Sequence, residues 1–143
     1  MTHLARREGT TYTARGSEMV FKATAASTDG AFSFMERELP PGGTPPLAHT
    51  HEGPEGFYVL DGEIEFTVGA TTFTVTSGGF ALAASGEPHT FANRSTSPAR
   101  LLIIHVPAAD AYFADLQELW SGAEAPSEER QRELYVKHGI TPV

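Results

Sequence analysis

Two histidines and a glutamate close together in the sequence have the side-chain types and spacing of a metal-binding group. His49 and His51 are separated by one residue, and Glu55 follows soon after. Successive side chains of an extended strand alternate faces, so both imidazoles point the same way from Cα atoms ~6.6 Å apart. Two imidazoles at that separation can share one metal ion. On a straight strand Glu55 would lie ~13 Å beyond His51, so it joins them only if the chain bends.

Gly53 and Pro54 encode such a bend, since glycine tolerates unusual dihedral angles and proline favours turns. A fourth donor, His89, follows a Ser-Gly-Glu-Pro turn farther along the chain. Three imidazoles and one carboxylate suit a first-row transition metal better than calcium or magnesium, which prefer all-oxygen ligands. We therefore expect one divalent transition metal ion. Iron, manganese, nickel, cobalt, copper and zinc all accept this donor set, so the metal stays open.

The elements that must position these donors are short strands separated by turns rich in glycine and proline. Residues 1–17 are interpreted as an arm or a short edge strand, and Asp61-Gly62 as a hairpin turn. We expect strands at residues 19–24, 31–39, 57–60, 63–68, 71–76, 80–83, 89–93 and 100–106. Many short strands at regular spacing are typical of an all-β double-sheet jelly roll.

The C-terminal third of the chain changes to helical spacing. Residues 107–120 place aromatic and aliphatic side chains at helical intervals, and Tyr112 is assigned to helix packing. A second helix begins after Ser127, a favoured N-cap residue, and ends at Gly139, so His138 lies in its last turn and is given no role. We expect one domain, residues 1–143, with a barrel core at about 18–106 and a helical extension at about 107–139.

Composition narrows the class of protein. The 143 residues carry a formal net charge of -8 without a lysine and arginine cluster, which disfavours binding to nucleic acid or an anionic membrane. The absence of cysteine excludes a disulfide framework, a thiolate nucleophile and a cysteine-based zinc site. The first residues lack the apolar core of a secretion signal, and no apolar run reaches transmembrane length. We expect a soluble cytoplasmic protein.

The two stretches that carry the donors resemble the paired signature motifs of the cupin superfamily. The first pattern, G-x5-H-x-H-x3-E-x6-G, is matched throughout, and the second, G-x5-P-x-G-x2-H-x3-N, departs only at Ala84 in place of proline. The matching residues are Gly43, His49, His51, Glu55 and Gly62 in the first motif, and Gly78, Gly86, His89 and Asn93 in the second. The resemblance implies a double-stranded β-helix barrel in which His49, His51, Glu55 and His89 hold one metal.

Four further side chains are expected to line the cavity beside the ion and to contact the substrate. Phe57 and Val59 share the strand parity of Glu55, and Phe91 shares that of His89. His105 interrupts an otherwise aliphatic strand, where a histidine can also be a hydrogen-bonded core residue. Such an aromatic and aliphatic lining favours a flat or apolar substrate over a sugar phosphate.

Within the superfamily, the chain looks most similar to small single-domain cupins of the quercetin dioxygenase-like kind. This resemblance implies a dioxygenase that uses O₂ on an enediol, flavonol or polyketide-like phenolic substrate, with Glu55 as both ligand and catalytic base. Two alternatives stay open: a non-redox, metal-assisted isomerase or cyclase, and a barrel that binds a small molecule without turnover. The resemblance and the exposed sheet edges suggest a homodimer.

Overall fold

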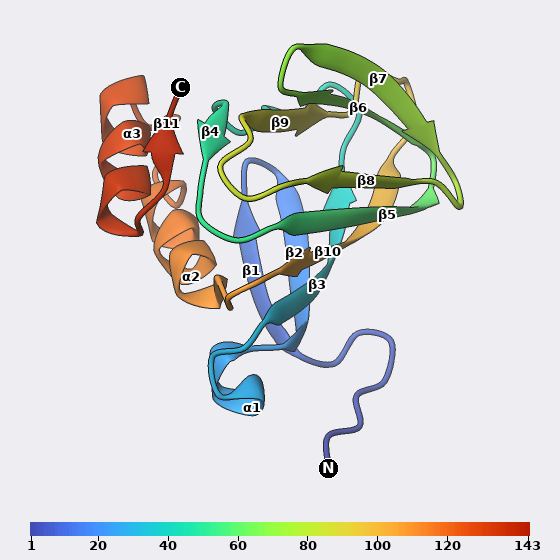
Figure 1. Cartoon of the computed structure of the whole chain (residues 1–143), viewed down its shortest axis with the longest axis vertical. Helices are drawn as coiled ribbons and strands as arrows, with labels where there is room; N and C mark the ends of the chain where they lie inside the picture. The colour runs from blue at the N-terminus through green and yellow to red at the C-terminus, as the bar shows by residue number, and fades with distance from the viewer.

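Two antiparallel β-sheets face each other in the computed structural model, which describes residues 1–143 (Figure 1). The six-stranded sheet has the order β1-β2-β3-β10-β5-β8, and the five-stranded sheet has the order β11-β4-β9-β6-β7. The strands are β1 (Thr10–Ala14), β2 (Ser17–Ala23), β3 (Ser33–Leu39), β4 (His49–Thr50), β5 (Glu55–Asp61), β6 (Glu63–Val68), β7 (Thr71–Thr76), β8 (Phe80–Ala83), β9 (His89–Ala92), β10 (Ala99–His105) and β11 (Thr141–Pro142). The predicted all-β, double-stranded β-helix jelly roll is confirmed.

Alternating side chains explain why these segments form strands that close around a core. In β10, Leu101 and Ile103 are fully buried, and the alternate residues Leu102 and Ile104 are partly exposed. In β6, Ile64 and Phe66 point inward in the same way. Burial of such apolar side chains between two sheets is the main stabilising contribution in this architecture. The core is therefore the space between the sheets.

The hairpin predicted at Asp61-Gly62 is not present in the structure. This pair does not close a hairpin, because β5 belongs to the six-stranded sheet and β6 to the five-stranded sheet. Gly62 has φ of 79°, and a Cβ there would lie 2.9 Å from the Pro98 carbonyl oxygen. In packed sheets the chain crosses from one layer to the other at such corners. The turn at Asp61-Gly62 was therefore predicted correctly, but the pairing of β5 with β6 was wrong.

Strands also occur outside the barrel core expected from the sequence. β1 pairs with β2 at one edge of the larger sheet. At the other end of the chain, Thr141 and Pro142 pair with Thr50 and His49 of β4. The C-terminal residues thus lie against the segment that carries two of the candidate ligands.

Both C-terminal helices are confirmed, as α2 (Asp110–Leu119) and α3 (Glu128–Lys137). They lie together at one side of the two sheets, next to β4 and β11 (Figure 1). Ser127 caps α3, because its side chain accepts a hydrogen bond from the Arg130 backbone N–H. A third, single-turn helix, α1 (Ala25–Thr28), replaces part of the turn expected before β3. None of these helices has the length and apolar composition needed to cross a membrane.

Candidate metal centre

The four candidate ligands come from both sheets and meet where the chain passes from one sheet to the other. His49 is the first residue of β4 and pairs with His89, the first residue of β9. Glu55 is the first residue of β5 and pairs with His105, the last residue of β10. His51 lies in the connection between β4 and β5. Strand pairing therefore places residues distant in sequence side by side.

The bend predicted before Glu55 is present and has a clear steric basis. Gly53 adopts φ of 81°, and its backbone lies so close to β10 that a Cβ would be 1.7 Å from the Val106 carbonyl oxygen. Only glycine fits this combination of left-handed backbone and close approach. The bend returns Glu55 to His51, so that Glu55 Oε2 lies 2.9 Å from His51 Nε2.

Backbone carbonyls orient the three imidazoles. The Nδ1–H groups donate to carbonyl oxygens two residues away: His49 to Leu47 at 2.7 Å, His51 to Gly53 at 3.1 Å and His89 to Glu87 at 2.8 Å. With the proton on Nδ1, each Nε2 of a neutral ring carries a lone pair. These hydrogen bonds therefore present three Nε2 atoms as ligands.

The ligand atoms of His49, His51, Glu55 and His89 all lie within 4.8 Å of one another. Glu55 Oε2 lies 2.9 Å from the Nε2 atoms of both His51 and His89. A neutral imidazole whose Nδ1–H binds a carbonyl turns a lone pair, not a proton, toward this carboxylate. A divalent cation between the nitrogens and the oxygen removes that conflict. The donor set thus fits one transition metal ion.

The electrostatic environment favours the ligating forms of two of these side chains. Burial, partly offset by the Leu47 carbonyl, lowers the pKa of His49 to about 4, so the ring is neutral at pH 7. Although burial alone would raise the pKa of the Glu55 carboxyl, His105, His51 and His89 together hold it well below its usual range. Burial opposes protonation of His51, but the adjacent Glu55 carboxylate and the backbone near Gly53 together outweigh this and raise its pKa.

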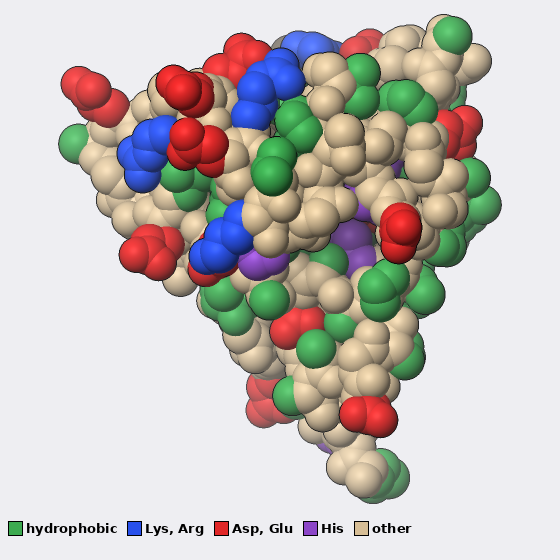
Figure 2. Space-filling view, turned by 60° about the vertical axis from the view of Figure 1, so that its left-hand side comes forward, with side chains coloured by type: hydrophobic (Ala, Val, Ile, Leu, Met, Phe, Trp, Pro, Cys, Tyr) green, Lys and Arg blue, Asp and Glu red, His purple; other side chains and the backbone are tan.

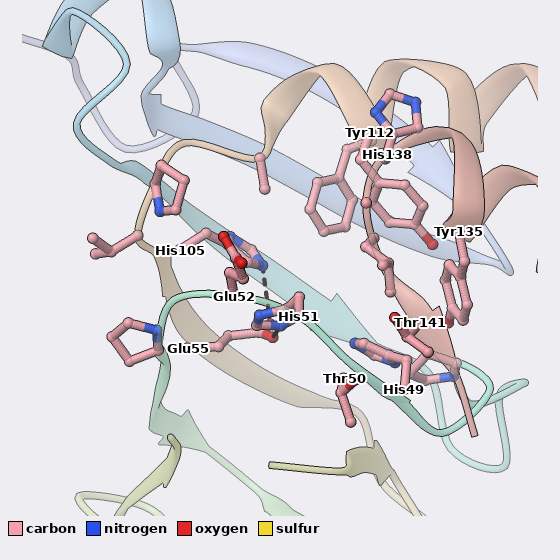
Figure 3. A pocket seen from close by; sticks show the side chains of 18 of the residues that line it. His49, Thr50, His51, Glu52, Glu55, His105, Tyr112, Tyr135, His138 and Thr141 are labelled. Carbon is pink, nitrogen blue, oxygen red and sulfur yellow. Dashed lines mark hydrogen bonds and ion pairs between the residues drawn. The ribbon is translucent and has the colours of Figure 1, made fainter. Parts of the chain in front are cut away.

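His105 contacts Glu55 from the side opposite the other histidines. Its Nε2 lies 2.9 Å from Glu55 Oε1, while its Nδ1 is buried without a hydrogen-bond partner. The ring packs against Phe113 of α2, with ring centroids 5.3 Å apart. His105 therefore lies beside the ligand group, outside the four residues that converge (Figure 3).

A cavity of about 690 Å³ opens from this group toward the C-terminal helices. On the corresponding face of the molecule, histidine side chains lie within a hollow (Figure 2). Phe91 and His105 line the cavity, and their contact with substrate stays a prediction. Phe57 and Val59 do not line it: both are buried in the core, where Phe57 packs on Phe66 and Phe91. That expectation is corrected, because aromatic packing fills the barrel below His89.

Several cavity residues were not identified from the sequence as site residues. Tyr112 of α2 and Tyr135 of α3 line the wall across from Glu55 and His105, together with His138 (Figure 3). Tyr135 donates its hydroxyl proton to the Leu47 carbonyl oxygen at 3.0 Å, the same oxygen that orients His49. Helical spacing predicted only that such side chains were buried, and gave no sign that the helices close a cavity.

Two arginines complete the wall. Arg15, in the turn between β1 and β2, and Arg37, in β3, both line the cavity. Neither lies within the two donor stretches, so no motif pointed to them. The alternation of β3 places Arg37 on the inward face, and this was the one sequence signal available.

Comparison with known proteins supports the fold and the ligand stretch. Residues 35–105 match the family described as Cupin domain. No curated protein matches the chain. The solved structure of TT1209 from Thermus thermophilus is 30% identical, with 73% of this chain and 90% of that chain covered and a TM-score of 0.53. A predicted oxalate decarboxylase from Thermotoga maritima is 27% identical, with coverage of 73% and 99% and a TM-score of 0.62.

The polyketide cyclase RemF from Streptomyces resistomycificus is a more distant structural relative. It is 22% identical, with coverage of 74% of this chain and 79% of that chain and a TM-score of 0.65. At this identity the likeness shows the fold alone. These solved structures share the fold, and two of them are named for different reactions, decarboxylation of oxalate and cyclisation of a polyketide.

Proposed function

Because this chain belongs to the cupin family through its domain at residues 35–105, we propose that it is a metal-dependent enzyme acting on a small molecule. One observation carries the proposal: three imidazoles and one carboxylate converge within 4.8 Å at a cavity of about 690 Å³. A cavity of this size accommodates a small organic substrate. A donor set that opens on such a cavity favours chemistry over a purely structural metal site.

A bound first-row transition ion would supply Lewis acidity and, for a redox-active metal, a site for O₂ chemistry. The chain's own groups handle the proton. Glu55 stays ionised, and Oε2 would accept a proton from a substrate hydroxyl when this oxygen is not bound to an ion. His105 donates its Nε2–H to Oε1 at 2.9 Å and so holds the carboxylate in position. The aromatic walls exclude water and orient a flat substrate.

The reaction we propose first is O₂-dependent cleavage of an enediol, flavonol or polyketide-like phenol, in which Glu55 is the catalytic base. The second candidate is a non-redox isomerisation or cyclisation of a related substrate. The contact between His105 and Glu55 favours this alternative specifically, because two adjacent proton-handling groups suffice to move a proton between carbon and oxygen without O₂. RemF is named a polyketide cyclase, which fits the second candidate, but its likeness reaches only to the fold.

Metal analysis of untagged protein, followed by oxygen-uptake assays, tests these proposals. We expect near-stoichiometric transition metal in the wild type and little in His49→Ala. Oxygen consumption with a flavonol or an enediol supports the dioxygenase. Product formation under argon supports the isomerase or cyclase. Wild-type protein that stays free of metal after reconstitution refutes the enzyme proposal and leaves a small-molecule-binding barrel.

We also propose a homodimer formed through the outer face of the larger sheet. Tyr58 of β5 and Phe80 and Leu82 of β8 are exposed there, and Phe80 pairs with Tyr58. Since β8 is an edge strand, a second copy can cover both the edge and these apolar side chains. Light scattering of the wild type and of Leu82→Glu tests this. A wild-type monomer contradicts it.

A further inference from the structure

Arg15 and Arg37 form a buried basic pair in the wall of the cavity, and neither has a carboxylate partner. Their side chains are 8% and 2% exposed, respectively. All ion pairs of the structure join other residues. Burying a charge is unfavourable unless an opposite charge or strong hydrogen bonds compensate it. The Glu55 carboxylate attracts Arg37 without contacting it directly, so two buried cations still share one cavity without a carboxylate partner, and packing does not explain this.

Protein contacts fix the positions of the two side chains. Arg37 donates its Nε–H to Ser17 Oγ at 2.9 Å, and its Cζ lies 5.3 Å from the Phe91 ring centroid. Arg15 Cζ lies 5.5 Å from the Trp120 ring centroid, and its Nε is buried without a hydrogen-bond partner. The guanidinium groups are thus held in place while N–H donors remain free for a ligand.

The two guanidinium groups also affect each other. Burial, and then the like charge of Arg15, lower the pKa of Arg37 to about 10. At neutral pH Arg37 therefore remains cationic. Burial likewise raises the pKa of Tyr112, and the charge of Arg15 opposes that rise, which places Arg15 near this hydroxyl. An anion between the arginines would relieve their repulsion.

We propose that Arg15 and Arg37 bind a carboxylate group of the substrate, in the cavity that Glu55 also lines. This inference rests on the proposed function, because it names the substrate class for the same cavity. A planar carboxylate matches the fork of a guanidinium group and accepts two parallel hydrogen bonds from it. Phe91 and Tyr112 flank the pair and fit a conjugated or aromatic body between its two ends.

The register of the larger sheet supports a substrate with two separate functional groups. Ser33 of β3 pairs with His105, which in turn pairs with Glu55. Arg37 follows Ser33 on the same face of β3, with its Cα ~13 Å farther along the strand. The carboxylate and the oxygen that reacts beside Glu55 therefore belong to two separate groups of one molecule.

Calorimetric titration with protocatechuate and its uncharged amide tests this inference. Both carry the same vicinal hydroxyl groups, and they differ in the group at the far end of the ring. We expect zinc-loaded wild-type protein to bind protocatechuate at least about 30-fold more tightly than the amide, the range for a buried charge pair. Arg37→Met and Arg15→Met should remove most of that difference without weakening binding of the amide.

Matched variants separate this inference from the proposed function. Arg100→Met is the control, because Arg100 lies on the same sheet but pairs with Glu36 outside the cavity. His49→Ala removes a metal ligand but neither arginine, so its preference for the carboxylate should persist. If only the metal proposal fails, this preference therefore remains intact.

Four results would overturn the inference. The first three are equal binding of acid and amide, no carboxylate binding to either metal-loaded or metal-free protein, and an equal loss of both ligands in Arg37→Met, which indicates a structural role. A preference for phenyl phosphate over benzoate also overturns it in favour of a phosphorylated substrate. Thermal unfolding of each variant checks its fold, and replacing an unpaired buried charge by Met should leave stability unchanged or higher.

Discussion

Gly53→Ala perturbs the bend that brings Glu55 back to His51, and the structure provides its magnitude. At φ of 81° an alanine is in the left-handed region, which costs about 1–2 kcal/mol. Its Cβ would also lie 1.7 Å from the Val106 carbonyl oxygen and 2.8 Å from the carbonyl carbon. Because neither backbone can yield without moving the other, we expect an overpacking cost of a further ~1–3 kcal/mol.

The matched control is Gly78→Ala. Gly78 has φ of 85°, but a Cβ there meets no atom within 4 Å, so only the conformational cost of about 1–2 kcal/mol applies. Urea unfolding of both variants isolates the steric contribution, and metal analysis shows whether the displaced bend still carries its ligands. We expect Gly53→Ala to be clearly less stable than Gly78→Ala and to bind less metal. Equal stability together with full metal content in Gly53→Ala would refute the reasoning.

Three further predictions concern the ligands, the core and the effect of pH. His49→Ala should lose nearly all bound metal, whereas His138→Ala, in the same cavity but outside the ligand group, should keep it. Elemental analysis measures the metal content of both variants, and equal content would contradict the assignment of His49 as a ligand. Phe57→Ala should lose about 3–5 kcal/mol of unfolding free energy, because Phe57 is 1% exposed. As a control, Val136→Ala, at a position 67% exposed, should change the unfolding free energy by less than ~0.5 kcal/mol in the same urea titration. Metal should be released as pH falls below neutral, because protons compete for His51, whose pKa the Glu55 carboxylate helps to raise, whereas His49, with a pKa of about 4, stays neutral. Full metal retention at mildly acidic pH would contradict this competition.

Local patterns in the sequence were sufficient for the ligand group and for most elements. The parity of His49 and His51 and the glycine at the bend depend on backbone geometry over a few residues, which the sequence encodes directly. The two C-terminal helices were predicted for the same reason, since capping and helical spacing act within one turn. The motif spacing then related His89 to the other three, although the strand pairing between His49 and His89 lies outside any local pattern.

Pairings and packing between distant segments were decided only in the tertiary structure. Asp61-Gly62 is a turn in either case, but whether it joins two neighbours in one sheet or crosses to the other depends on how both sheets close. The same holds for Phe57, whose inward parity is compatible with either a cavity wall or the core.

The arginine pair shows this distinction most clearly. Alternation along β3 places Arg37 on the same face as Met35 and Leu39, which the sequence analysis did not use. The sequence did not determine that Arg15, from a different turn, lies in the same cavity, or that α2 and α3 close over both. The energy of a buried charge depends on the distances to all surrounding charges and on its exclusion from water, and only the folded chain sets these quantities.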